Sequence, residues 1–500
     1  MNKKNLKQTF PTTIVPGTRE MKMPGPVTMS RSTPTGSENN SDSLRVRMYR
    51  VGFGDFFLMT IPSDSGPQHI LIDCGVTGGR TGKGDLGTIK DAVADMATET
   101  QKKLALIIVT HRHMDHIIGF SRCAEQFKDF EVAEIWMSIW ETEYDSKISE
   151  LQADLNSIAL SAQNYIALAA DDMPQKQDMS AMLQNATGLV LGMKGGGGGT
   201  NAASLALLKN GFGVKPKYYC KGQQVEMPKV LAGAGLSAEI LGPPPTDATQ
   251  FMKLMDLRKG VGQYLQAAES SRSSKIFRPF LEAWQTEASS YPESAFREWK
   301  PRGSVKPSTR GVNRALEKAV QAAQPAALMS AVKRLDDFLN NQSLVVLFTY
   351  KGKKLLFAGD AQGGNWEYWM YDDAQPTTTP SGKIGKDAAA VLSDLVFYKV
   401  GHHGSTNATP IAAVENMNSG FVAMCSTQED CFGSVDNNSE VPRRPLLNAL
   451  SAKCALVRSD QIDVKARGKV VPRSQDTDSA FHIPKAGQFK VGSCYVDYLL

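Results

Sequence analysis

The sequence lacks three features that would place it quickly in a class of proteins. None of its 7 cysteines forms a CxxC pair, so neither a disulfide framework nor a cysteine-based zinc site is predicted. The longest apolar runs, such as Leu104 to Val109, fall far short of the roughly 20 residues that a membrane-crossing helix needs. The net charge of +5 over 500 residues is too small to indicate a nucleic-acid or membrane partner by itself.

Export signals are also missing. The stretch from Gln8 to Met29 contains four prolines and no apolar core, so we expect no secretory signal. Together with the scattered cysteines, this favours a soluble protein of the reducing cytoplasm. Hydrophobic residues make up 41% of the chain and charged residues 21%, the ordinary proportions of a globular protein. The length predicts two or more modules, or one core with large insertions.

Short segments of strand character alternate with helical ones, which indicates an α/β fold. The run from Lys103 to Thr110 is rich in Ile and Leu and is expected to be a strand buried on both faces. Helices are expected over Ile89 to Glu99 and Ile117 to Phe127. Further strands are expected over Leu44 to Val51, Phe56 to Ile61, His69 to Asp73, Glu131 to Ile139, Lys215 to Tyr219, Ala238 to Leu241, Ser343 to Tyr350, Leu355 to Phe357 and Leu395 to Val400.

Histidines are few but concentrated. The chain has 7, of which His69 and His482 stand alone and are expected to be ordinary surface or core residues. The others lie just after expected strands, in a segment with His111, His113, Asp115 and His116 and in the pair His402 and His403. Such spacing allows two ligands to point to each side of a turn, as two adjacent metal ions require. Imidazole with carboxylate suits Zn²⁺ best, with Mn²⁺ or Fe as alternatives.

The His-x-His-x-Asp-His segment resembles the signature of the metallo-β-lactamase fold superfamily. Other segments resemble the same superfamily: Val51 to Asp55 its opening strand and turn, Leu71 to Gly75 its next strand, and Phe357 to Asp360 the motif whose aspartate bridges two metals. The segment Val400 to Ser405 is similar to the His-His-Gly-Ser motif of the branch that contains the hydrolase domain of ComEC competence proteins. The resemblance implies an αββα four-layer sandwich with the active site at one edge.

The resemblance also implies a ligand set. His111 and His113 would hold the first metal, Asp115 and His116 the second, and Asp360 would bridge them. One residue of the pair His402 and His403 would complete the second site. We favour His402 as the ligand, because it is nearer the strand end, with His403 facing substrate, although the sequence does not settle their order.

One histidine of the superfamily is absent, since none occurs between His116 and His402. The ComEC-like branch shares this lack, so the first site is expected to be more open and completed by water. Glu141 or Asp145, just after a strand, are alternative ligands.

The expected chemistry is hydrolysis by a hydroxide shared between two cations, with no serine or cysteine nucleophile. Asp115 would orient the hydroxide. Ser405, Thr406 and Asn407 would either donate hydrogen bonds to substrate oxygens or only shape the turn. Asp73 is expected to bond the second nitrogen of a ligand histidine, and Asp55 is a weaker candidate for a similar role.

Two stretches are basic. Six basic residues lie between Arg297 and Arg314 beside Trp299, and eight lie between Arg443 and Arg473. They predict either contacts to a phosphate backbone or merely solvated surface. With the ComEC-like resemblance, they favour a phosphodiester substrate, so that the protein would be a nuclease or nucleotide phosphodiesterase with two Zn²⁺. The alternatives are a carboxylic ester, lactone or amide hydrolase and a non-enzymatic scaffold or partner-binding protein. The membrane channel of ComEC is missing, so a role in DNA uptake is not implied.

The expected organisation follows from these segments. Residues 1–43 form a disordered tail, 44–143 the N-terminal half of the metallo-hydrolase core, 144–214 a helical insertion, 215–245 core strands, 246–339 a helical and partly basic insertion, and 340–500 the C-terminal half of the core.

Overall fold

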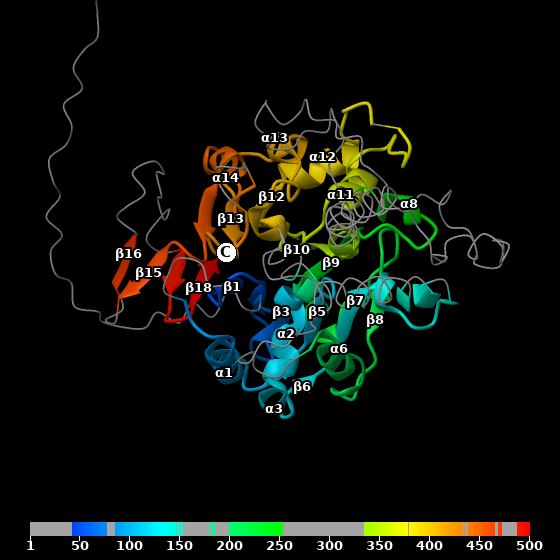
Figure 1. Ribbon diagram of the computed structural model, residues 1–500. Coiled ribbons are helices and arrows are strands. Elements are labelled where there is room, and N and C mark those ends of the chain that lie inside the picture. The colour runs from blue at the N-terminus through cyan, green and yellow to red at the C-terminus, as the bar shows by residue number, and fades with distance from the viewer. Residues whose placement is uncertain are drawn as a thin grey trace, which may run out of the picture. The chain divides into compact units, whose positions relative to one another are not determined.

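The structure is a computed structural model in which every described element lies within Ser41–Leu500 (Figure 1). It describes residues 43–77, 86–146, 148–150, 152–153, 180, 183–185, 200–252, 254, 335–378, 380–433, 435, 439–465, 469–472 and 488–500. The expected tail and most of the two expected insertions lie outside these residues, as do His482 and the basic stretch from Arg297 to Arg314. In the part of the chain that is described, no helix is both long and apolar enough to cross a membrane.

The fold is mixed α/β and contains two large mixed sheets. The 8-stranded sheet has the order β17 (Phe489–Val491), β18 (Tyr495–Leu499), β1 (Arg45–Tyr49), β2 (Phe56–Ile61), β3 (Gln68–Cys74), β5 (Leu106–Val109), β7 (Ile135–Ser138) and β8 (Lys217–Tyr219). The 6-stranded sheet has the order β14 (Ala455–Arg458), β13 (Val422–Cys425), β12 (Leu395–Lys399), β11 (Lys353–Phe357), β10 (Val345–Tyr350) and β9 (Leu236–Gly242). Two small sheets pair β4 (Lys103–Leu104) with β6 (Glu131–Val132) and β15 (Ile462–Lys465) with β16 (Lys469–Pro472).

The helices are short. They include α1 (Ile89–Thr100), α2 (Met114–Arg122), α3 (Ala124–Phe127), α6 (Asn201–Asn210), α7 (Lys229–Gly233), α8 (Thr249–Met252), α11 (Gly363–Met370), α12 (Lys386–Ser393), α13 (Ile411–Asn416) and α14 (Arg444–Ser451), with 3₁₀ turns η1 (Ile139–Glu141) and η4 (Gly401–Gly404). Thr88 caps α1, because its side chain accepts a hydrogen bond from the Asp91 backbone N–H.

Alternating side chains of the strands form three apolar cores. The first lies between the two large sheets and includes Phe57 of β2 and Phe357 of β11, whose rings meet edge to face. The second packs the outer face of the 8-stranded sheet, such as Leu71, against α1, α2 and α6. The third packs the outer face of the 6-stranded sheet, such as Leu356, against α11, α12, α13 and α14. Each large sheet is therefore covered by the other sheet on one face and by helices on the opposite face.

Several expected elements differ in detail. The run expected as one strand from Lys103 to Thr110 is divided between β4 and β5, because Lys103–Leu104 pairs with β6 while Leu106–Val109 joins the large sheet. The helix expected from Ile117 begins earlier, at Met114, and ends at Arg122. The C-terminal strand β18 was not anticipated, yet it pairs with β1 along the whole length of that strand.

Candidate metal centre

The chemistry-bearing residues come from the carboxyl ends of neighbouring strands. In the 8-stranded sheet, β3 and β5 are parallel, and they lead to Asp73 and to His111. In the 6-stranded sheet, β11 and β12 are parallel, and they lead to Asp360 and to the pair of histidines in η4. Parallel strands deliver their carboxyl ends to one edge of a sheet, where ligand sites of α/β proteins commonly lie.

Four buried side chains form the centre of the site. The ligand atoms of Asp115, His116, Asp360 and His403 all lie within 4.8 Å of one another. His116 Nε2 is 3.0 Å from Asp360 Oδ2, and His403 Nε2 is 3.2 Å from Asp115 Oδ2 and 3.4 Å from Asp360 Oδ2. Imidazole and carboxylate atoms at this spacing are a donor set that suits Zn²⁺.

A second pair of imidazoles lies beside this cluster. His111 Nε2 is 3.0 Å from His113 Nδ1, and the ring centroids of His111 and His116 are 4.1 Å apart. Both residues of the pair are fully buried. The sequence led us to expect one group of ligands with His111 and His113 and a second with Asp115 and His116. The side chains lie in two such adjacent groups, and Asp360 lies in the second.

The order of the two adjacent histidines differs from our preference. Both have positive φ, 42° for His402 and 51° for His403, and this left-handed backbone turns their side chains in different directions. His403 is fully buried in the cluster, whereas His402 is 20% exposed and its Nε2 lies 4.0 Å from Asp360 Oδ2. The preference for His402 as the ligand of the second group, based on its closeness to the strand end, is therefore corrected in favour of His403.

Partners outside the cluster determine which nitrogen of each ring faces inward. His403 Nδ1 donates to the backbone carbonyl of Ser426 at 2.8 Å, and since a carbonyl only accepts, Nε2 is the nitrogen that would carry the lone pair when the imidazole is neutral. His116 Nδ1 donates to Asp73 Oδ2 at 2.8 Å. Asp73 is itself held by the backbone N–H and the hydroxyl of Thr110, at 2.8 and 2.7 Å. Asp73 thus makes the contact that the sequence led us to expect.

His111 has outer partners of the same kind. Its Nδ1 lies 3.1 Å from Thr110 Oγ1 and 3.3 Å from Ser343 Oγ. Ser343 Oγ also accepts the backbone N–H of Asp360 at 3.0 Å. One hydroxyl thereby connects a residue of the first imidazole pair to the aspartate of the central cluster.

Lys399 is a component of the site that sequence reasoning missed. It lies at the end of β12, is buried, and forms ion pairs with Asp55 and, at 3.5 Å, with Asp360. A lysine within the apolar run Leu395 to Val400 was the available signal, because a buried lysine needs a charged partner. Asp55 also lies 3.6 Å from His403 Nδ1, so it contacts the site as anticipated, although mainly through Lys399.

The turn after the histidine pair contacts His402 rather than the central cluster. Ser405 Oγ is 2.7 Å from His402 Nδ1 and donates to Asn407 Oδ1 at 2.8 Å. Asn407 Oδ1 lies 3.1 Å from the same imidazole nitrogen, and Thr406 is partly buried between the two residues. Ser405 and Asn407 therefore hold His402 in place.

The two proposed substitute ligands have other roles. Both carboxylate oxygens of Glu141 accept hydrogen bonds from Arg112, each at 2.7 Å. Asp145 Oδ1 accepts the backbone N–H of Ile148 at 3.4 Å, at the start of a helical turn. Neither carboxylate belongs to the groups of close ligand atoms among the described residues, so the alternative in which one of them replaces the missing histidine is not supported by the geometry.

Carboxylates dominate the electrostatics of the central cluster. Burial alone would lower the pKa of His403, but the charges of Asp360 and Asp55 outweigh it and raise that pKa to about 10. The pKa of His116 is raised in the same way, chiefly by Asp360. Burial would raise the pKa of Asp115, yet His116 and His403 lower it to about 2. By contrast, burial lowers the pKa of His113 to about 4 and that of His111 well below its ordinary value, so both imidazoles of this pair are neutral at pH 7.

Several inward-facing atoms make no hydrogen bond to any described residue. They include His116 Nε2, His403 Nε2 and Asp115 Oδ1; all are buried, and the two nitrogens lie 3.0–3.4 Å from carboxylate oxygens without forming a hydrogen bond to them. Buried polar atoms are almost always paired, so three such atoms converging on one point indicate positions for a ligand. The donor set and these atoms together fit a metal ion.

No protein-family model and no curated protein matches this sequence.

Proposed function

We propose that this protein is a dinuclear metal-dependent hydrolase and that phosphodiesters are its substrates. The observation that carries the proposal is the buried cluster of Asp115, His116, Asp360 and His403, which has unpaired inward-facing atoms and adjoins His111 and His113.

The excess of buried negative charge in the site supports the binding of two cations. The carboxylates of Asp55, Asp73, Asp115 and Asp360 are all buried there, and Lys399 is the one buried lysine that contacts them among the described residues. Buried charges are stable only when they are paired or bind metals. Two divalent cations would offset this excess of negative charge, one beside His111 and His113 and the other beside Asp115, His116 and His403, with Asp360 shared.

We also propose that the fold is the αββα four-layer sandwich of the metallo-β-lactamase type. Two observations support this finer assignment: the face-to-face core between the sheets and the helices on both outer faces. The placement of the His-x-His-x-Asp-His segment at the end of β5, and of the histidine pair at the end of β12, agrees with it.

Bound cations would lower the pKa of a water between them toward neutrality and polarise the scissile group of the substrate. The protein's own residues have separate roles. Asp115 Oδ1, which makes no hydrogen bond to a described residue, would accept a hydrogen bond from that water and so orient it. His402 donates from Nδ1 toward Ser405 and Asn407, so its partly exposed Nε2 has the lone pair and would accept a hydrogen bond from the substrate or the attacking water.

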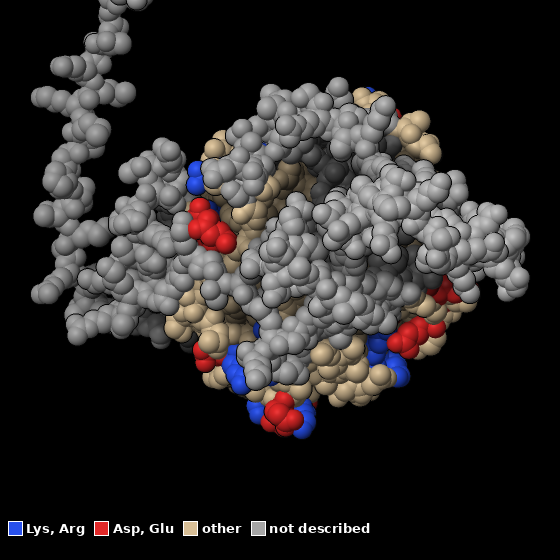
Figure 2. Space-filling model, viewed as in Figure 1, with Lys and Arg blue, Asp and Glu red and all other residues tan. Residues whose placement is uncertain are grey.

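Phosphodiester substrates are supported by the ComEC-like histidine motif and by the basic stretch from Arg297 to Arg314. Zn²⁺ is the expected metal, with Mn²⁺ as the alternative. A carboxylic ester or lactone is the second candidate, because Arg112, which follows His111 in the sequence, is engaged by Glu141. On the face shown in Figure 2, described basic and acidic side chains lie side by side.

The test is hydrolysis of bis(p-nitrophenyl) phosphate and of p-nitrophenyl acetate by protein loaded with Zn²⁺ or Mn²⁺. Asp360→Asn should remove the activity, whereas Asp394→Asn, which changes an exposed carboxylate paired with Lys354, should not. Cleavage of the phosphodiester supports the first candidate, and cleavage of the acetate alone supports the second. Loaded protein that cleaves neither compound, nor DNA, RNA or a lactone, would favour a non-enzymatic scaffold.

A further inference from the structure

Four imidazoles of the site are held by a hydrogen-bond partner other than a histidine on the strands or turns that carry the site, whereas His113 has no such partner among the described residues. The four are His111, His116, His402 and His403. Its Nδ1 faces His111 Nε2 at 3.0 Å. For Nδ1 to present a lone pair to a cation, the proton must be on Nε2. That nitrogen is buried, and a partner on this side would fix the ring in the tautomer that binds metal.

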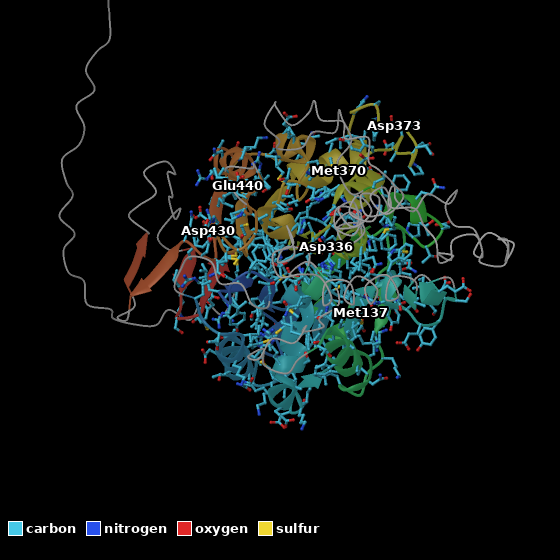
Figure 3. All side chains as sticks on the ribbon, viewed as in Figure 1. Met137, Asp336, Met370, Asp373, Asp430 and Glu440 are labelled. Carbon is cyan, nitrogen blue, oxygen red and sulfur yellow. The ribbon has the colours of Figure 1, made fainter. Side chains whose placement is uncertain are left out.

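Asp336 is a carboxylate within ion-pair distance of that nitrogen. Its Oδ1 lies 3.5 Å from His113 Nε2, and it is only 18% exposed. Figure 3 labels Asp336 near the middle of the view, between the blue to cyan half of the ribbon and the yellow to orange half. Asp336 belongs to residues 335–340, which are helical and end the segment 246–339 that we expected to be an insertion.

This helix presents a second polar residue to the site one turn later. Asn340 Nδ2 lies 3.4 Å from His402 Nε2 and 3.4 Å from Asp336 Oδ2. Residues four apart share one face of a helix, so the face that carries Asp336 is directed at the histidines.

The helix is fixed firmly to the core. Asn341, directly after it, donates to the backbone carbonyls of Met252 and Leu254 and accepts the backbone N–H of Asn365. The backbone N–H of Leu344 then donates to the carbonyl of Thr110, next to His111. The position of Asp336 relative to the first imidazole pair is therefore set by hydrogen bonds to the same loop that carries the pair.

We propose that Asp336 is a positioning residue for His113: it accepts the Nε2 proton of that imidazole and so directs Nδ1 toward the cation held with His111. The segment before β10 thereby becomes part of the metal centre rather than only a cover for it. The proposal rests on the proposed function, since it needs a cation beside His111 and His113.

The test is a Co²⁺ titration of metal-free protein, followed by visible absorption and by competition with a chelator. Wild type should bind two equivalents. Asp336→Ala should weaken one of the two by about 10–100-fold, the usual effect of losing a residue that orients a ligand. Asp336→Asn should keep most of the affinity, because its amide oxygen still accepts the proton.

A double-mutant cycle separates this role from a general effect on folding. If Asp336 acts through His113, adding Asp336→Ala to His113→Ala should cost no further affinity, whereas adding it to His403→Ala should cost the full amount. Equal losses in both backgrounds, or unchanged affinity in Asp336→Ala, would overturn the proposal while leaving two-metal binding intact. Should Asp336→Ala fold poorly, Asp336→Ser replaces it in the cycle. A wild type that binds no Co²⁺ would instead refute the proposed function, and this inference with it.

Discussion

Lys399, on the inner face of the 6-stranded sheet, forms a buried ion pair with Asp55, which precedes β2 of the other sheet. Burial opposes the charge of Lys399, but Asp55 and Asp360 outweigh it and raise the lysine pKa. The pair therefore connects the two sheets next to the candidate metal centre, since Lys399 also contacts Asp360. It brings a positive charge to a site that has four buried carboxylates, those of Asp55, Asp73, Asp115 and Asp360.

Removing that charge should destabilise the metal-free protein. Lys399→Met leaves Asp55 buried without its cation, and breaking a buried pair in this way costs about 3–5 kcal/mol. Urea unfolding measures the loss, which added Zn²⁺ should reduce because bound cations replace the missing charge. Lys354→Met, in an exposed pair with Asp394, is the control and should leave the midpoint unchanged. Equal midpoints for Lys399→Met and wild type would show that the pair is not needed.

The two adjacent histidines should differ in what they contribute. His403→Ala removes a nitrogen of the central cluster, so it should reduce the affinity for one cation by more than the roughly 10–100-fold that follows loss of an orienting residue. His402→Ala should leave affinity within about 10-fold but reduce turnover, because its Nε2 faces the opening. Chelator competition and initial rates measure both effects. A larger loss of affinity in His402→Ala would restore the order that we first favoured.

The sequence was sufficient to predict that the site residues follow the ends of strands. It was not sufficient to predict the directions of their side chains or their contacts with residues distant in sequence. The His-x-His-x-Asp-His segment and Asp360 were identifiable because polar residues that follow apolar strands are conspicuous. Which of His402 and His403 turns inward depended on two successive left-handed backbone conformations, which the sequence does not reveal. Lys399 and Asp336 were missed because their roles depend on residues distant in sequence: Asp55 for the lysine and His113 for the aspartate. The pairing of β18 with β1 was missed for the same reason.

Gly75 allows the end of β3 to contact the loop that carries the ligands. A Cβ atom at this position would lie 2.2 Å from both the carbonyl carbon of Asp115 and the backbone nitrogen of His116. Gly75→Ala should therefore displace those two residues, with a loss of about 1–3 kcal/mol in stability and weaker metal binding. Gly233→Ala is the matched control, since the space around its Cβ is open. Unchanged metal affinity in Gly75→Ala would argue that the loop adjusts freely.

His69 should make stability depend on pH independently of the metal centre. Burial lowers its pKa from 6.5 to about 4, so the folded state holds this imidazole neutral while the unfolded state protonates it more readily. Its contribution is present in full above pH 6.5 and is lost as the pH falls toward 4. At pH 5 the loss is about 2 kcal/mol.

The comparison is between wild type and His69→Gln, which can still contact Thr60 Oγ1, the partner of His69 Nδ1 at 3.1 Å. Urea midpoints at pH 7.5 and pH 5 should fall further for wild type than for the variant. Identical pH profiles would mean that the folded protein accommodates a protonated His69.

The central claim is that Asp115, His116, Asp360 and His403, with His111 and His113, bind two cations. Elemental analysis of purified protein after dialysis tests it most directly, alongside Asp360→Asn. We predict close to two zinc or manganese ions per chain in wild type and fewer than one in the variant, because Asp360 is shared by both positions. A wild-type protein without stoichiometric metal, even after incubation with Zn²⁺ and Mn²⁺, would contradict the account.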